Sequence, residues 1–156
     1  VKRLPAEVLL DAINHACGTQ DKFSGIPAGT RAIELPDPNY ASYFLDTLGR
    51  PKRVVTCECE RTAQPNLAQV LHIANGAVLN DKISDKNGRI AKLLAEKQKT
   101  DEELIRQLYL HTFSRLPSSE DMARSKDIIA KAPNRKEGVE DLLWALCNSR
   151  EFLFNH

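Results

Sequence analysis

The residues with the most reactive chemistry lie between positions 53 and 61, where two thiols alternate with two carboxylates. In an extended backbone alternate side chains share a face, so Cys57 and Cys59 point to the same side. Two thiols on one face can bind a soft metal ion or undergo redox chemistry. With His72 from the next predicted helix they form a candidate metal site, Cys57, Cys59 and His72, to which Cys17 can add a fourth ligand. Buried thiols or disulfides are the structural alternative.

Glu58 and Glu60 occupy the other side of this segment, between Arg53 and Arg61. A pair of carboxylates can divide the roles of general acid and general base when their surroundings separate the two pKa values. In an enzyme, the candidate catalytic residues lining a cleft are Glu58, Glu60, Arg61 and His72. Two arginines can also lock two glutamates into structural ion pairs, and we favour this second interpretation.

Other polar residues have weaker functional patterns. Asp11 and His15 are four positions apart on the polar side of a predicted helix, a spacing at which a carboxylate can orient an imidazole. No nucleophile accompanies them, so we expect a solvated pair. His111 lies among predicted core residues and is expected to be a structural histidine. Residues 50–53 form a basic tip that could meet a phosphate, a sulfated sugar or an acidic partner, although we expect it to be solvated.

Apolar residues recur at helical spacing along most of the chain, and these stripes define the elements that must position the candidate residues. The first stripe runs from Leu9 to Ala16, between Pro5 and Gly18, and a second extends from Leu67 to Val78. A short helix is predicted from Tyr40 to Leu48. Further helices are predicted after Gly88, at the capping sequences that begin with Thr100 and Ser118, and after Asn134.

The sequence therefore predicts an all-α fold, a single compact bundle of about six or seven helices in one domain, residues 1–156. A long irregular segment separates the first and third helices, because residues 18–65 hold five of the eight prolines and four of the seven glycines. Runs at 32–35 and 54–57 could be extended. Long loops in compact domains are often functional, so residues 18–39 are the first place to look for a site. The apolar residues near the C-terminus predict a tail that docks on the bundle.

Charge and composition exclude some classes of function. Lys and Arg number 22 against 21 Asp and Glu, so the net charge of +1 gives no electrostatic reason to expect nucleic-acid binding. No apolar run approaches the ~20 residues that a membrane-spanning helix needs. The four cysteines allow two disulfides in three connectivities, and the sequence does not choose among them. Because the chain begins Val1-Lys2-Arg3, we expect a fragment of a larger protein.

Several stretches, taken in order, resemble one family, and the most specific of them is Cys-Glu-Cys-Glu-Arg at 57–61. The resemblance is to the C-terminal part of the planctomycete-type domain of unknown function, which occurs in large secreted proteins that carry a cytochrome-c-like domain nearer the N-terminus. It covers the chain nearly from end to end. The similar segments are 3–13, 29–32, 35–37, 44–51, 57–61, 71–76 and 142–156.

This resemblance implies a periplasmic or secreted protein from bacteria that degrade complex, often sulfated polysaccharides. A haem c would belong to another part of the parent protein, and no cofactor is expected in this fragment, which has no haem-attachment motif. An oxidising compartment favours disulfides over free thiols. The family brings no established activity to any residue here.

Three functional hypotheses follow. We favour a non-catalytic helical module that binds another domain of its parent protein or a glycan, with residues 18–39 and 57–61 as the recognition surface. The alternatives are part of an enzyme that uses Glu58, Glu60, Arg61 and His72, or a thiol-metal or redox site at Cys57 and Cys59.

Overall fold

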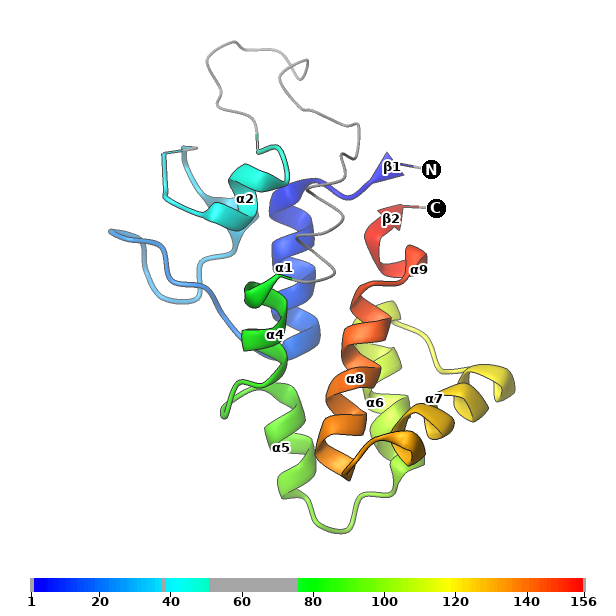
Figure 1. Ribbon diagram of the computed structural model, residues 1–156. Coiled ribbons are helices and arrows are strands. Elements are labelled where there is room, and N and C mark those ends of the chain that lie inside the picture. Colours follow the sequence, from blue (N-terminus) through cyan, green and yellow to red (C-terminus); the bar gives the residue numbers. More distant parts are fainter. Residues whose placement is uncertain (1, 38, 51–75, 156) are drawn as a thin grey trace.

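The computed structural model describes residues 2–37, 39–50 and 76–155, and their arrangement is shown in Figure 1. Within these ranges the chain forms eight α-helices, which confirms the all-α prediction. The only strands described there are two residues long. In chain order the elements are β1 (Lys2–Arg3), α1 (Ala6–Cys17), the 3-10 helix η1 (Ala32–Glu34), α2 (Tyr43–Thr47), α4 (Ala77–Ile83), α5 (Arg89–Ala95), α6 (Asp101–Phe113), α7 (Ser119–Lys131), α8 (Arg135–Cys147), α9 (Arg150–Leu153) and β2 (Phe154–Asn155).

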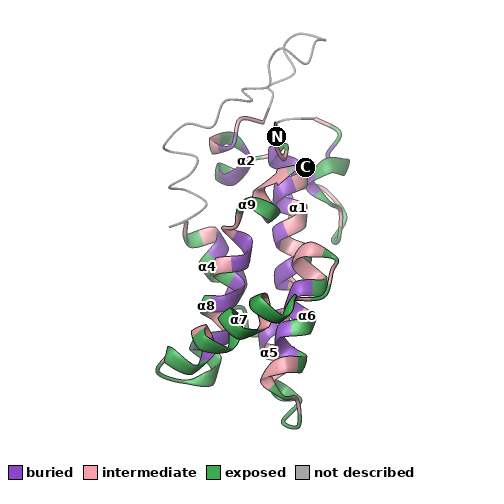
Figure 2. Ribbon diagram, turned by 90° about the vertical axis from the view of Figure 1, so that its right-hand side faces the viewer, coloured by how far each residue is buried: buried purple, intermediate pink, exposed green. Residues whose placement is uncertain are grey.

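Helix α1 lies at the centre of the bundle because its apolar stripe faces several neighbours at once. Leu9, Ile13 and Ala16 are completely buried, as the spacing of the stripe predicts. The helix packs against α2, α4, α5, α6 and α8. Figures 1 and 2 show α1 alongside α4 and α8, with buried positions on the sides where the helices meet. Pro5 is the N-cap, one position before the first helical residue, and Gly18 ends the helix as predicted.

The three long helices α6, α7 and α8 begin at the capping residues that the sequence predicts. The side chains of Thr100, Ser118 and Asn134 each accept a hydrogen bond from the backbone N–H three residues further on. Helix α7 covers the bundle with a narrow face, and most of its surface is exposed in Figure 2. It packs closely on α8 at Gly138, where an added Cβ would lie only 2.8 Å from the Cα of Ile129.

Three boundaries differ from the sequence prediction. The helix expected over 67–78 does not run through Gly76, which has an extended conformation and caps a new helix, α4. Residues 32–34, expected to be extended, form η1, where the Glu34 carboxylate accepts the backbone N–H of Arg31 and the Asp11 carboxylate accepts those of Ala32 and Ile33. Helix α6 ends at Phe113, before Pro117, with Ser114 in the left-handed conformation.

The two ends of the chain lie side by side (Figures 1 and 2). Strands β1 and β2 pair antiparallel, and the N–H of Leu4 donates to the carbonyl of Leu153 at 3.0 Å. Phe152 is buried, which confirms that the tail docks on the bundle. Arg115 fixes this end of the fold by donating to both carboxylate oxygens of Glu151, at 2.6 and 2.8 Å, and to Asp121 at 2.9 Å.

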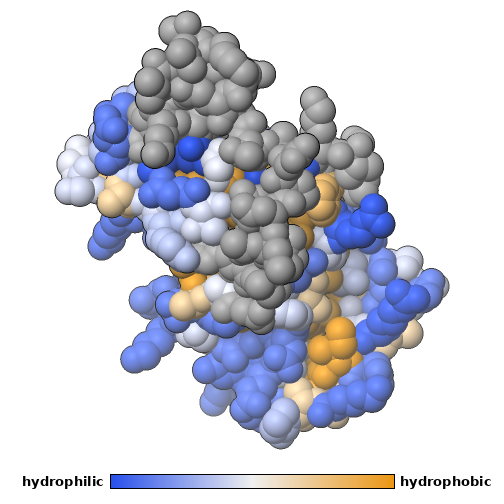
Figure 3. Space-filling view, turned by 45° about the horizontal axis from the view of Figure 1, so that its top comes forward, coloured by the Kyte–Doolittle hydropathy of each residue, from blue (hydrophilic) through white to orange (hydrophobic). Residues whose placement is uncertain are grey.

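The surface of the described part of the chain is largely polar. The face shown in Figure 3 is mostly hydrophilic, with apolar atoms in separate small areas. Among the described helices, none combines the length and the apolar character needed to cross a bilayer.

Candidate functional site: a polar pocket at the end of α1

A pocket of about 650 Å³ opens where α1 ends and α5 begins. Its walls are polar, and apart from Gly18 every residue that lines it carries a polar or charged side chain. The α1 side and the following loop contribute Asn14, His15, Thr19, Gln20 and Lys22. The opposite side, formed by the turn before α5 and by α5 itself, contributes Asp85, Asn87, Arg89 and Lys92.

The sequence builds this pocket by ending α1 at Gly18 and placing Arg89 against that end. Gly18 has φ +66°, and an added Cβ would lie 3.1 Å from the backbone nitrogen of Arg89, so both the conformation and the contact favour glycine. The Arg89 guanidinium donates to the carbonyls of Ala16 and His15, at 2.8 and 2.7 Å. The His15 carbonyl also accepts the Gly18 N–H at 3.3 Å, so the bonds from Arg89 add to the backbone bonds that close the end of α1.

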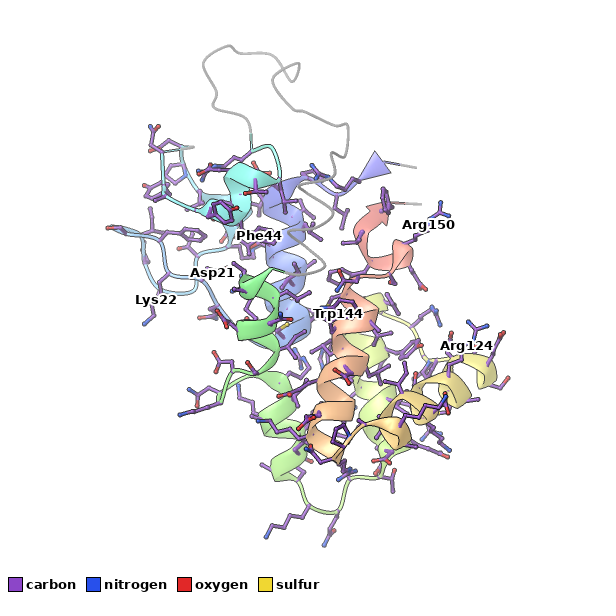
Figure 4. The ribbon with its side chains drawn as sticks, in the orientation of Figure 1. Asp21, Lys22, Phe44, Arg124, Trp144 and Arg150 are labelled. Atoms are coloured by element: carbon purple, nitrogen blue, oxygen red, sulfur yellow. The ribbon has the colours of Figure 1, made fainter. Side chains whose placement is uncertain are left out.

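A buried hydrogen-bond network beside the pocket joins α1, its following loop and α4. The Lys82 ammonium, whose side chain is only 10% exposed, donates to Asn14 at 2.7 Å and to Asp21 at 2.8 Å. The Asn14 amide also donates to Asp21 at 2.8 Å, and the Thr19 hydroxyl donates to the Asn14 side-chain oxygen at 3.1 Å. Figure 4 shows Asp21 and Lys22 on the segment that follows α1. Asn14 is thus bonded to Lys82, Asp21 and Thr19, and these bonds orient its side chain at the wall of the pocket.

Two histidines meet next to the pocket. The rings of His15 on α1 and His111 on α6 lie edge to face, with centroids 5.5 Å apart. Burial lowers the pKa of His111, and the positive charges of Arg89 and His15 lower it further. The lowered pKa favours the neutral imidazole, and His111 is half-buried against its neighbours as a structural histidine would be.

Asp11 does not orient His15, so the predicted solvated pair is not formed. Its carboxylate accepts the backbone N–H groups of Ala32 at 2.7 Å and Ile33 at 3.1 Å, at the start of η1. Sequence spacing along one helix could not reveal this partner, because η1 lies 21 residues further along the chain.

The electrostatics of the pocket favour an anion. Lys22, Arg89 and Lys92 bring three positive charges to its walls, against the single carboxylate of Asp85. Neither Lys22 nor Lys92 has a carboxylate partner among the described residues. Amide and hydroxyl groups supply both donors and acceptors around these cations. The Thr19 hydroxyl donates to Asn14 and keeps its oxygen available as an acceptor.

The residues that the sequence singles out for chemistry fall partly outside the described ranges. Cys57, Cys59, Glu58, Glu60, Arg61 and His72 all lie between 51 and 75, and the hypotheses that rest on them stay predictions. Cys17, the possible fourth ligand, is buried and is hydrogen-bonded to Cys147. In residues 2–37, 39–50 and 76–155, no three His, Cys, Asp or Glu side chains are grouped as metal ligands.

Arg50 is not part of a solvated basic tip. Its side chain is 7% exposed and donates to the carbonyl of Tyr40 and to Asp46, so it holds the loop around α2. The expectation that residues 18–39 contain part of a site is consistent with the pocket, to which Gly18, Thr19, Gln20 and Lys22 contribute. Sequence reasoning missed the opposite wall, for which the only local signal is the turn-forming run Asp-Lys-Asn-Gly at 85–88.

Comparison of the chain with protein-family models, with curated proteins and with solved structures found no match.

Proposed function

We propose that the chain is a non-catalytic helical module that binds a glycan carrying acidic groups, such as a sulfated polysaccharide, in the pocket at the end of α1. The observation that carries the proposal is the composition of the pocket walls, in which three cations stand among amide and hydroxyl groups and only one carboxylate is present. A sulfate ester needs charge-assisted donors, and the ring hydroxyls of a sugar need groups that both donate and accept.

The fold supports this proposal by preparing the pocket in advance. The network of Lys82, Asn14 and Asp21 holds one wall, and the two bonds from Arg89 to the end of α1 hold the other. A site whose groups are already ordered loses little conformational entropy on binding. Lys22 and Lys92 are exposed and can reach a bound sulfate without breaking any ion pair among the described residues.

The proposed setting is a multidomain protein outside the cytoplasm, in which this module also contacts other domains of its parent. This part of the proposal rests on the family resemblance of segments such as 57–61 and 142–156. Any haem c would reside in another domain. Fractionation of cells that express the parent protein tests the compartment, and recovery in the cytoplasmic fraction would count against it.

The binding proposal is tested by isothermal titration calorimetry with a sulfated galactan tetrasaccharide and with the same tetrasaccharide lacking sulfate. We expect only the sulfated sugar to bind, with an affinity that falls as the salt concentration rises. Lys22→Gln and Lys92→Gln should each weaken binding roughly tenfold, because each removes a hydrogen bond to a charged group.

The matched control is Lys97→Gln, which removes the same charge from an exposed lysine outside the pocket. It should bind the sulfated sugar as the wild type does. Equal losses in Lys97→Gln and Lys92→Gln would reveal general electrostatic attraction in place of a site, and equal binding of both sugars would refute recognition of the sulfate.

A further inference from the structure

Two cysteines that are far apart in the sequence meet inside the bundle. Cys17 is the last residue of α1 and Cys147 is the last residue of α8, and each is only 1% exposed. The two helices pack against each other, and the two thiols are hydrogen-bonded. They are the two free cysteines of the described residues.

We propose that Cys17 and Cys147 form a disulfide that links α1 to α8 when the protein folds under oxidising conditions. Thiols that share a hydrogen bond lie near each other, and a disulfide forms between cysteines whose Cα atoms are about 4.4–6.8 Å apart. A Cys17–Cys147 bond corresponds to one of the three connectivities that four cysteines allow. The proposal is independent of whether the pocket binds a glycan.

The oxidant is a disulfide, either a small molecule such as oxidised glutathione or a disulfide of an oxidising protein. The thiolate of one cysteine, for example Cys17, attacks one sulfur of this disulfide, and one thiolate leaves. The thiolate of Cys147 then attacks the Cys17 sulfur, the Cys17–Cys147 bond forms, and the second thiolate leaves. The pair gives up two electrons and two protons, and the oxidant becomes two thiols.

In the folded bundle the two thiols differ in acidity. The hydrogen bond from Cys147 lowers the pKa of Cys17, and the nearby charges of Lys82 and Arg89 act in the same direction, while burial opposes them. The pKa of Cys147 is raised by the same hydrogen bond and by burial. Because both sulfurs are covered in the folded protein, the exchange takes place while α1 and α8 are still coming together, before these surroundings are formed, and either thiolate can attack first.

The disulfide would act on both stability and the pocket. It closes a loop of about 130 residues, and long loops gain the most from closure in the chain-entropy account. It would also fix the backbone next to Gly18, whose neighbour Arg89 forms a wall of the pocket.

Peptide mapping tests the connectivity directly. The whole protein is refolded in a mixture of oxidised and reduced glutathione, quenched with acid, alkylated and digested with trypsin without reduction. Cleavage after Lys and Arg separates the cysteines into three peptides, 4–22 with Cys17, 54–61 with Cys57 and Cys59, and 137–150 with Cys147. We expect mass spectrometry to find peptides 4–22 and 137–150 joined in most molecules. Alkylated free thiols at Cys17 and Cys147, or a link from either to peptide 54–61, would overturn the proposal.

Thermal unfolding provides a second test that does not depend on digestion. The oxidised wild type should unfold roughly 10 °C above the same protein in reductant, given the length of the closed loop. Cys17→Ser and Cys147→Ser should each abolish this reductant-dependent shift. The double variant Cys57→Ser/Cys59→Ser is the control and should retain it. Loss of the shift only in the control variant would show that the stabilising disulfide lies elsewhere.

Discussion

Gly18 offers the sharpest test of how the pocket is built, because two separate effects oppose any side chain there. Its φ of +66° is a left-handed conformation, which costs an alanine about 1–2 kcal/mol. Its Cβ would also lie 3.1 Å from the backbone nitrogen and 3.2 Å from the Cβ of Arg89, so α5 would have to move by a few tenths of an ångström. We assign about 1 kcal/mol to this crowding. Gly18→Ala should therefore lower the free energy of unfolding by about 2–3 kcal/mol.

The chain provides a matched control in Gly25, which also has a positive φ, +77°, but has no atom within 4 Å of an added Cβ. Gly25→Ala should lose only the conformational part, about 1–2 kcal/mol. The free energies are measured by urea unfolding followed by circular dichroism at 222 nm, and compared where the slopes agree. Equal losses in the two variants would refute the close approach of Arg89 to the end of α1 and, with it, the described wall of the pocket.

Three further predictions concern packing and charge. Gly138→Ala should destabilise the protein by about 1–3 kcal/mol, because the alanine Cβ would lie 2.8 Å from the Cα of Ile129. An unchanged urea midpoint would contradict the packing of α7 on α8. Lys82→Met should lower the free energy of unfolding by about 1–3 kcal/mol, because it removes the buried donor to Asn14 and Asp21. The control Lys126→Met, at an exposed ion pair, should leave the urea midpoint unchanged. Equal effects of the two substitutions would argue against the buried network. The hydrogen bond from Arg115 holds the pKa of the Asp121 carboxyl below its usual 3.8. The stabilisation that the charged carboxylate gives the folded protein is therefore present above pH 3.8, and it is lost as the pH falls through the lower pKa of Asp121 in the folded protein. The urea midpoint of the wild type should thus fall more steeply below about pH 4 than that of Asp121→Asn, and parallel curves would refute the assignment.

The helix starts could be predicted from the sequence because capping is local. Thr100, Ser118 and Asn134 each bond to a backbone N–H three residues away, and that spacing is visible in the sequence. The break at Gly76 was missed for a related reason. An apolar stripe that includes Val78 continues past Gly76 at helical spacing, and the spacing carries no information on the backbone angles of the glycine between.

The pocket and the cysteine pair could not be predicted, because their partners are distant in the sequence. Arg89 bonds to the carbonyl of His15 across 74 positions, and Cys17 meets Cys147 across nearly the whole chain. Such contacts depend on which helices pack together, and apolar periodicity defines a helix face without defining what covers it. The loop after α1 was recognised only because its composition and length are unusual.

The most direct test of the proposed glycan site is an NMR titration of the ¹⁵N-labelled protein with the sulfated galactan tetrasaccharide. If the pocket is the binding site, the amide signals of Thr19, Gln20 and Asn87 should shift progressively and saturate together, while signals from the exposed face of α7 stay in place. Shifts that gather on another surface, or signals of these three residues that do not move at saturating sugar, would contradict the account.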